Sequence, residues 1–245
     1  MSGNLITELG YSGKIPSRGD FLSQGLTMGF VDSWNEWLQA VLAVSREQLT
    51  DQWLDTYLTS PIWHFALSAD VCGNSPMLGS LIPSVDQVGR HYPFTLAKVL
   101  QAPVVQARLQ QSWTEQHESL ILQVLEDDFN LTHWQKLLTK QSLEWPAEQQ
   151  IQLGHTTRTQ AKAAIAIEVA DDIDPALLLH QSYQQHYGRY CIWWTQGSEL
   201  IPPCTLLSTG LPQVSQFAAM LDGDWQRWGW QHSQIKPSQT KAAGK

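Results

Sequence analysis

The fold of this chain is decided by residues 62–100, which read IWHFALSADVCGNSPMLGSLIPSVDQVGRHYPFTLAKVL. Three short apolar or aromatic runs lie in this stretch, at residues 62–67, 77–82 and 92–100. The residues between these runs include glycine, proline, serine and aspartate, which is the pattern expected between adjacent strands of a sheet. The second connection, residues 83–89, is too long for a tight hairpin turn. We therefore expect three neighbouring strands and one polar loop of specific shape.

The sequence on both sides of these strands predicts helices. Between Phe30 and Leu49 the large apolar residues recur at helical spacing, which predicts a core-facing helix with Asp32 or Ser33 as its N-cap. A second short helix is expected from Thr50 until Pro61 ends it. Further helices are expected at 104–125, 131–138, 175–187 and 212–221, and further strands just before residue 13, near 163–169 and at 190–195.

Together these elements predict an α+β fold, with a single mixed, largely antiparallel sheet flanked by helices. The sequence contains no internal repeat and no clear domain linker. We therefore expect one domain over residues 1–236. Residues 237–245 are small, polar or charged, which predicts a disordered tail.

Composition disfavours several classes of partner. Lysine and arginine total 15 and aspartate and glutamate total 23, so the formal net charge of −8 argues against general binding to nucleic acids or anionic membranes. No basic stretch followed by an apolar core opens the chain, and no run approaches the roughly 18 apolar residues of a spanning helix. We expect a cytoplasmic protein without membrane insertion. The three cysteines are widely spaced, so they are expected to be buried small hydrophobes.

Twelve tryptophans are available to build a core or a binding surface. Trp34, Trp37 and Trp53 fall on the predicted helix faces, so we assign them to the core. Trp225, Trp228 and Trp230 lie near the carboxy terminus. We expect these three to dock onto the protein's own core, with a partner-binding surface as the alternative.

A second informative stretch, residues 13–21, reads GKIPSRGDF and contains two cations, one carboxylate, two glycines and one proline. Glycine and proline give such a segment a specific shape, and its charges suggest recognition. A phosphate-binding loop is disfavoured, because Glu8 occupies the position of the motif's first glycine and Ile15 that of its hydroxyl. We name residues 13–20 the first loop and residues 83–90 the second loop.

The two loops are expected to lie near each other at one end of the sheet and to bind a protein. The predicted protein-binding residues are Lys14, Pro16, Arg18, Asp20, Ser84, Asp86 and Arg90. The alternative is a structural network in which Arg18 and Asp20 pair with Asp86 and Arg90 and pin the loops together.

Motifs for catalysis or metal binding are not evident. The sequence has no G-x-S-x-G elbow, H-E-x-x-H motif or dinucleotide-binding G-x-G-x-x-G, and its eight histidines lack ligand spacing. The residues therefore do not exclude catalysis but give no indication of it, and we expect no cofactor and no metal site. A hydrolase that uses Ser84, Asp86 and His91 is a weak alternative, because their spacing matches no known nucleophile arrangement.

Four blocks carry a family resemblance: GKIPSRGDF at 13–21, SREQL at 45–49, WLDTYLTSPIW at 53–63, and PSVDQVGR at 83–90 followed by Tyr92 and Pro93. Their order and spacing resemble the amino-terminal domain of TagF, also called ImpM, a family of type VI secretion system-associated proteins. The resemblance is strong over residues 8 to about 98. WWT at 193–195 and GLP at 210–212 look like weaker later features.

The resemblance implies a cytoplasmic accessory protein that represses type VI secretion after translation by binding a forkhead-associated scaffold protein. It implies no enzymatic activity, and a separate protein phosphatase as a further possible partner. From the residues alone, the alternative function is a small-molecule or nucleotide sensor whose ligand lies against the first and second loops.

Overall fold

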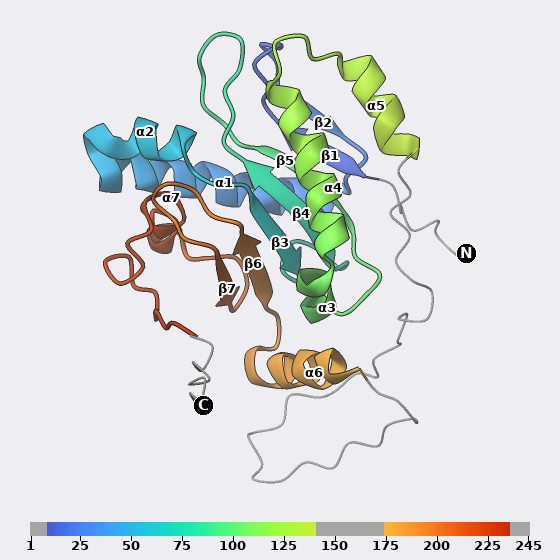
Figure 1. The fold of residues 1–245 in the computed structure, drawn as a ribbon, viewed down its shortest axis with the longest axis vertical. Coiled ribbons are helices and arrows are strands. Elements are labelled where there is room, and N and C mark those ends of the chain that lie inside the picture. The colour runs from blue at the N-terminus through green and yellow to red at the C-terminus, as the bar shows by residue number, and fades with distance from the viewer. Residues whose placement is uncertain (1–8, 141–173, 236–245) are drawn as a thin grey trace, which may run out of the picture.

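The structure is a computed structural model that describes residues 9–140 and 174–235 of the chain. These residues form one seven-stranded sheet with the order β2-β1-β5-β4-β3-β6-β7, flanked by helices (Figure 1). Each neighbouring pair is antiparallel, and the α+β prediction is confirmed. The strands are β1 (Gly10–Gly13), β2 (Leu22–Gln24), β3 (Trp63–Leu67), β4 (Met77–Ile82), β5 (Phe94–Val99), β6 (Cys191–Thr195) and β7 (Cys204–Ser208).

Both faces of the sheet carry hydrophobic cores, because successive side chains of a strand point to opposite faces. In β3, Phe65 packs into a core with α1 (Met28–Leu49), α2 (Trp53–Leu58) and α7 (Ala219–Asp222). Its neighbour Ala66 packs into a different core on the other face. The three central strands are therefore buried along their whole length, as their apolar sequences predict.

The opposite face is covered by α3 (Val104–Leu109), α4 (Gln111–Leu122), α5 (Leu131–Lys140) and α6 (Pro175–Tyr187). In Figure 1, α4 lies in front of the sheet and α1 runs behind it. Residues of α4 and α5 pack on β1 and β5, whereas residues of α3 and α6 pack near β3 and β6. The short 3-10 helices are η1 (Thr50–Gln52), η2 (Gln123–Leu125) and η4 (Val214–Gln216).

The structure corrects the predicted boundaries of several helices. The first helix begins at Met28 with Thr27 as N-cap, and not near Asp32 or Ser33, because the apolar stripe marks only the buried part of a helix. The second predicted helix, from Thr50, begins as the 3-10 turn η1 and continues as α2.

The predicted helix over residues 104–125 is interrupted at Gln110, where φ is −88° and ψ is 82°. Leu109, just before this break, is 66% exposed. On either side of this break, α3 contacts β3 and β6 and α4 contacts β4 and β5. One straight helix could not follow both pairs of strands.

The two edge strands were not predicted. The strand β2 has three residues, too few for a clear apolar pattern. The strand β7 has five, but only one of them is buried, so it lacks the continuous buried run of β6. The strand expected near 163–169 and the disordered tail expected at 237–245 lie outside the described residues.

The carboxy-terminal tryptophans dock on the protein's own core, as predicted. Trp225 is buried, and Trp228 and Trp230 pack against the same core. The indole N–H of Trp228 donates to Asp222 Oδ2 at 2.8 Å, and that of Trp230 donates to the carbonyl oxygen of Gln216 at 3.0 Å. This segment closes the α1 side of the sheet.

Candidate functional site

The first and second loops lie against each other, as the sequence predicts. The first loop connects β1 to β2, and the second lies between β4 and β5. The backbone N–H of Gln87 donates to the carbonyl oxygen of Arg18 at 3.0 Å. The Arg90 guanidinium donates to the carbonyl oxygen of Gly19 at 2.7 Å. Main-chain groups, and not only side chains, therefore fix how the loops meet.

Asp86 lies at the centre of this contact and is buried, with 3% of its surface exposed. Its Oδ2 accepts hydrogen bonds from Lys14 Nζ and from Arg90 Nε, both at 2.7 Å. Its Oδ1 accepts from the backbone N–H of Arg90 at 2.8 Å and of Val88 at 3.1 Å. Burial alone would raise the pKa of the Asp86 carboxyl, but these donors outweigh it and hold the pKa well below its ordinary value. Asp86 is therefore a buried anion that ties both loops together.

The base of the second loop is held by Tyr57 of α2. The Tyr57 hydroxyl donates to the carbonyl oxygen of Ser84 at 2.9 Å and accepts from the Ser84 N–H at 3.0 Å. Tyr57 stacks on Trp53, and the Arg46 guanidinium also lies over the Trp53 indole, 4.3 Å from its ring centroid. Burial raises the pKa of Tyr57, so its hydroxyl keeps its proton for this bond. All four sequence blocks therefore converge on one place in the fold.

The first loop is anchored at both of its ends. Ile15 is fully buried in the core beneath α4 and α5. Just beyond the loop, Phe21 meets Tyr92 edge to face, with ring centroids 5.4 Å apart. The Tyr92 hydroxyl in turn donates to Asn35 Oδ1 of α1 at 2.9 Å. The supporting roles of Tyr57 and Tyr92 were not predicted from the sequence, although both residues lie in or beside the blocks that resemble the family.

The predicted site residues separate into buried supports and exposed side chains. Ser84 and Asp86 are buried and cannot contribute to an exposed surface, Lys14 is 15% exposed, and Pro16 is half-buried. Arg18 and Asp20 are exposed, and in residues 9–140 and 174–235 neither side chain has a hydrogen bond or ion pair. Arg90 is tied to Asp86 yet has 62% of its side chain exposed.

The pinning network predicted as the alternative exists, but with different members. Asp86 pairs with Arg90 of its own loop, which was not predicted, and its partner from the first loop is Lys14 and not Arg18. Asp20 takes no part in it. The exposed surface of the loops is accordingly formed by Arg18, Asp20, Val88 and the outer part of Arg90, with Phe21 beside them; we call it the loop surface.

The geometry gives no support for chemistry at Ser84, Asp86 and His91. Ser84 Oγ is buried without a hydrogen-bond partner, and both Asp86 oxygens are occupied. His91 packs edge-on against Trp53 and Tyr57, and burial and then the nearby Arg46 lower its pKa. In the described part of the chain, no group of three or more His, Cys, Asp or Glu side chains could hold a metal ion. None of the described helices is long and apolar enough to cross a membrane.

Comparisons with known proteins give a family match and a similar solved structure. Residues 10–141, more than half of the chain, match a family described as "TagF N-terminal domain, Type VI secretion system-associated". The crystal structure of PA0076 from Pseudomonas aeruginosa PAO1 matches with a TM-score of 0.71 and 30% sequence identity, over 94% of this chain and 97% of that chain. No match was found among curated proteins.

Proposed function

This chain belongs to the TagF family of type VI secretion-associated proteins, and from that premise we propose that it represses type VI secretion after translation by binding a forkhead-associated scaffold protein. Membership of this family supports an accessory regulatory role, and the partner and the repression are part of the proposal. The observation that carries the proposal to particular residues is the buried Asp86 that fixes the loop surface. In this role the protein acts by binding and performs no turnover.

The rigidity of the loops favours a role in protein binding. Asp86, Tyr57 and the backbone bonds between the loops hold the main chain of both loops in place before a partner arrives. A preordered surface loses less conformational entropy on binding than a flexible one. Arg18, Asp20 and the 69% exposed Val88 offer charged and apolar contacts within that surface.

Protein binding accounts for the loops better than a small-molecule or nucleotide sensor does. The sensor hypothesis relies on Lys14 and Arg90 as cations that attract an anionic ligand. Both are already paired with Asp86, so an anion would have to compete with a buried carboxylate. Arg18, which has no such partner in the described part of the chain, lies on an exposed loop.

The test is direct binding between the purified chain and the purified forkhead-associated protein of the same secretion system. We expect the double variant Arg18→Ala, Val88→Ala to weaken binding by tenfold or more, because it removes a charged and an apolar contact. Its Tm should stay within about 2 °C of the wild type, because both side chains are exposed.

The matched control is Arg189→Ala, which removes an arginine near the opposite end of the sheet, beside β6. It should leave the affinity unchanged. Absence of binding by the wild-type chain would overturn the proposed partner. Wild-type affinity in the double variant would keep the partner but remove the loop surface as its site.

A further inference from the structure

The strand β7 ends the sheet on the side opposite to β2, and it is open to pairing. It bonds to β6 with the register Cys191↔Ser208 to Thr195↔Cys204. Within residues 9–140 and 174–235, no backbone group of β7 bonds to any other segment. Its sequence, CTLLS, contains no charge and no proline of the kind that protects edge strands.

A groove runs along this open edge. Two pockets of about 600 Å³ and about 460 Å³ share four lining residues, Thr205 and Leu206 of β7 together with Trp230 and Gln231. The pockets extend from Pro202 to Leu211 and so follow the whole strand. We call them together the β7 groove.

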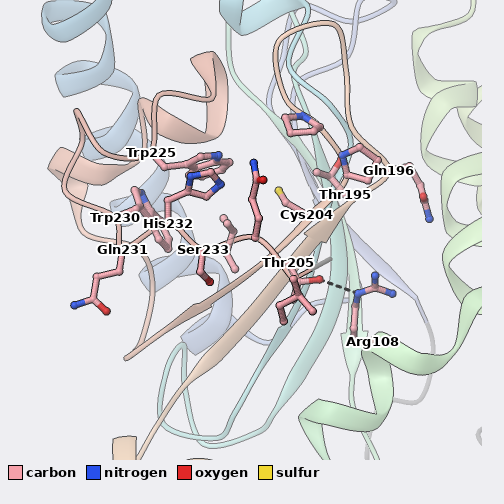
Figure 2. A pocket seen from close by; sticks show the side chains of 15 residues that line it. Arg108, Thr195, Gln196, Cys204, Thr205, Trp225, Trp230, Gln231, His232 and Ser233 are labelled. Carbon is pink, nitrogen blue, oxygen red and sulfur yellow. Dashed lines mark hydrogen bonds between the residues drawn. The ribbon is translucent and has the colours of Figure 1, made fainter. Parts of the chain in front are cut away.

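The two sides of the β7 groove differ in chemistry. Trp225, Trp230 and His232 lie on one side of β7, and Arg108 of α3 lies on the other (Figure 2). The Arg108 Nε donates to Thr205 Oγ1 at 3.1 Å. Its terminal nitrogens have no hydrogen-bond partner in the described part of the chain, so they remain available to a ligand.

The groove is also free of negative charge. Its lining includes no aspartate and no glutamate, although the chain as a whole has a net charge of −8. A carboxylate placed at Arg108 would therefore meet a cation with free donors and no lining carboxylate to repel it.

We propose that the β7 groove binds an extended peptide segment of a partner protein, which adds to the sheet beside β7 and alternates apolar and acidic residues. Successive side chains of an added strand point to opposite faces. One residue would therefore face Trp225 and Trp230, while the next would direct its carboxylate to Arg108. Backbone hydrogen bonds to β7 would supply affinity, and the two walls would supply specificity.

The chemistry favours a partner segment over β7 of a second copy and over residues 236–245 of this chain. Pairing of β7 with β7 of a second copy would bring no carboxylate to Arg108, because CTLLS is uncharged. Residues 236–245 of this chain, KPSQTKAAGK, contain three lysines and no acidic side chain. An acidic segment from another protein satisfies both walls of the groove.

The test uses two fluorescein-labelled heptapeptides, TVEVEVT and TVKVKVT, titrated with the full-length protein and followed by fluorescence anisotropy. We expect the acidic peptide to bind at least tenfold more tightly than the basic one. Methylation of the backbone nitrogens of TVEVEVT should abolish binding, because an added strand needs those donors. Arg108→Gln should reduce the preference for the acidic peptide to less than threefold, whereas Arg189→Gln should preserve it.

Each other outcome overturns the proposal. Absence of binding by TVEVEVT, or equal binding of both peptides, removes the acidic segment as occupant. Undiminished binding of the methylated peptide would exclude strand addition as the mode of binding. Light scattering at the assay concentration reports a competing β7–β7 dimer, and a dimer that excludes the peptide would assign the edge to a second copy. These results bear on β7 alone and leave the loop surface untouched.

Discussion

At the scale of single residues, the most consequential side chain is Asp86. A carboxylate loses its hydration when buried, and Asp86 tolerates this because Lys14, Arg90 and two backbone N–H groups replace the lost water. Asp20 lies on the neighbouring loop and stays exposed to water. Two aspartates on adjoining loops therefore have opposite roles, one in stability and the other on the surface.

The first prediction follows from this contrast. Asp86→Asn should lower the Tm by roughly 5 °C or more, because it leaves the mostly buried Lys14 ammonium without its anion. Asp20→Asn is the matched control and should change the free energy of unfolding by less than about 0.5 kcal/mol. Thermal unfolding measures the Tm, and urea unfolding, with an unchanged slope m, measures the free energy of unfolding of both variants. Equal stability of the two variants would contradict the role assigned to Asp86.

The sequence predicted the meeting of the loops but not which charges pair. Glycine, proline and charges mark a shaped polar loop wherever they occur, so local sequence is sufficient for that inference. The Lys14–Asp86 pair joins residues 72 positions apart. Asp86 pairs with Lys14 and not with Arg18 because Lys14 lies deeper below the surface. The depth of each residue is set by the antiparallel register of β1, β5 and β4.

At the scale of elements, β1 ends where two backbones approach closely. Gly13 has φ +140°, and a Cβ added there would lie 2.3 Å from the carbonyl oxygen of Pro93 and 2.7 Å from the Cα of Phe94. Both neighbours are main-chain atoms of the segment that leads into β5, so neither can move aside cheaply. Glycine at this position lets the first loop leave the sheet against the end of the second.

The second prediction tests this close approach. Gly13→Ala should destabilise the fold by about 1–3 kcal/mol, because it adds both a clash and an unfavourable backbone angle. Gly19→Ala, in the same loop, has no atom within 4 Å of its added Cβ and should be within about 0.5 kcal/mol of the wild type. Thermal unfolding compares them. A Gly19→Ala variant as unstable as Gly13→Ala would mean that the whole loop, and not one contact, is intolerant of change.

Long apolar elements were predictable from sequence, whereas short ones and breaks were not. The strands β3, β4 and β5 and the helix α1 carry enough periodic residues to identify them. The break at Gln110 has no glycine or proline to mark it and arises because α3 and α4 follow different strands. Such a feature is set by packing, which local sequence does not encode.

At the scale of the whole molecule, buried histidines connect stability to pH. Burial, together with the neighbouring His64 and Lys98, lowers the pKa of His117 well below its ordinary value. Burial also lowers the pKa of His180, to about 4. Both lie on the face of the sheet covered by α3, α4 and α6, where His117 packs on Trp113 with ring centroids 3.7 Å apart. In the folded state these imidazoles stay neutral at pH values where the unfolded chain would protonate them.

The last prediction is therefore that acid destabilises the protein in two stages. Between about pH 6.5 and pH 4 the unfolded chain binds protons on His117 and His180 that the folded chain does not, so stability falls as the pH falls, by at most about 1.4 kcal/mol per pH unit for each histidine. Below about pH 4, Asp86 also becomes protonated in the unfolded chain, whereas in the folded chain its pKa is depressed and it stays ionised. The stabilisation that this carboxylate provides is therefore lost next as the pH falls.

Urea unfolding at half-unit pH steps, on the wild type and on His180→Gln, measures this dependence. The variant should have a shallower slope between pH 6.5 and pH 4 and the same loss below pH 4, because the loops and the buried histidines belong to different parts of the fold. A wild-type stability that stays flat from pH 7 to pH 5 would contradict neutral burial of both imidazoles. An unchanged slope in His180→Gln would leave His117 as the group that makes the α4 face sensitive to acid.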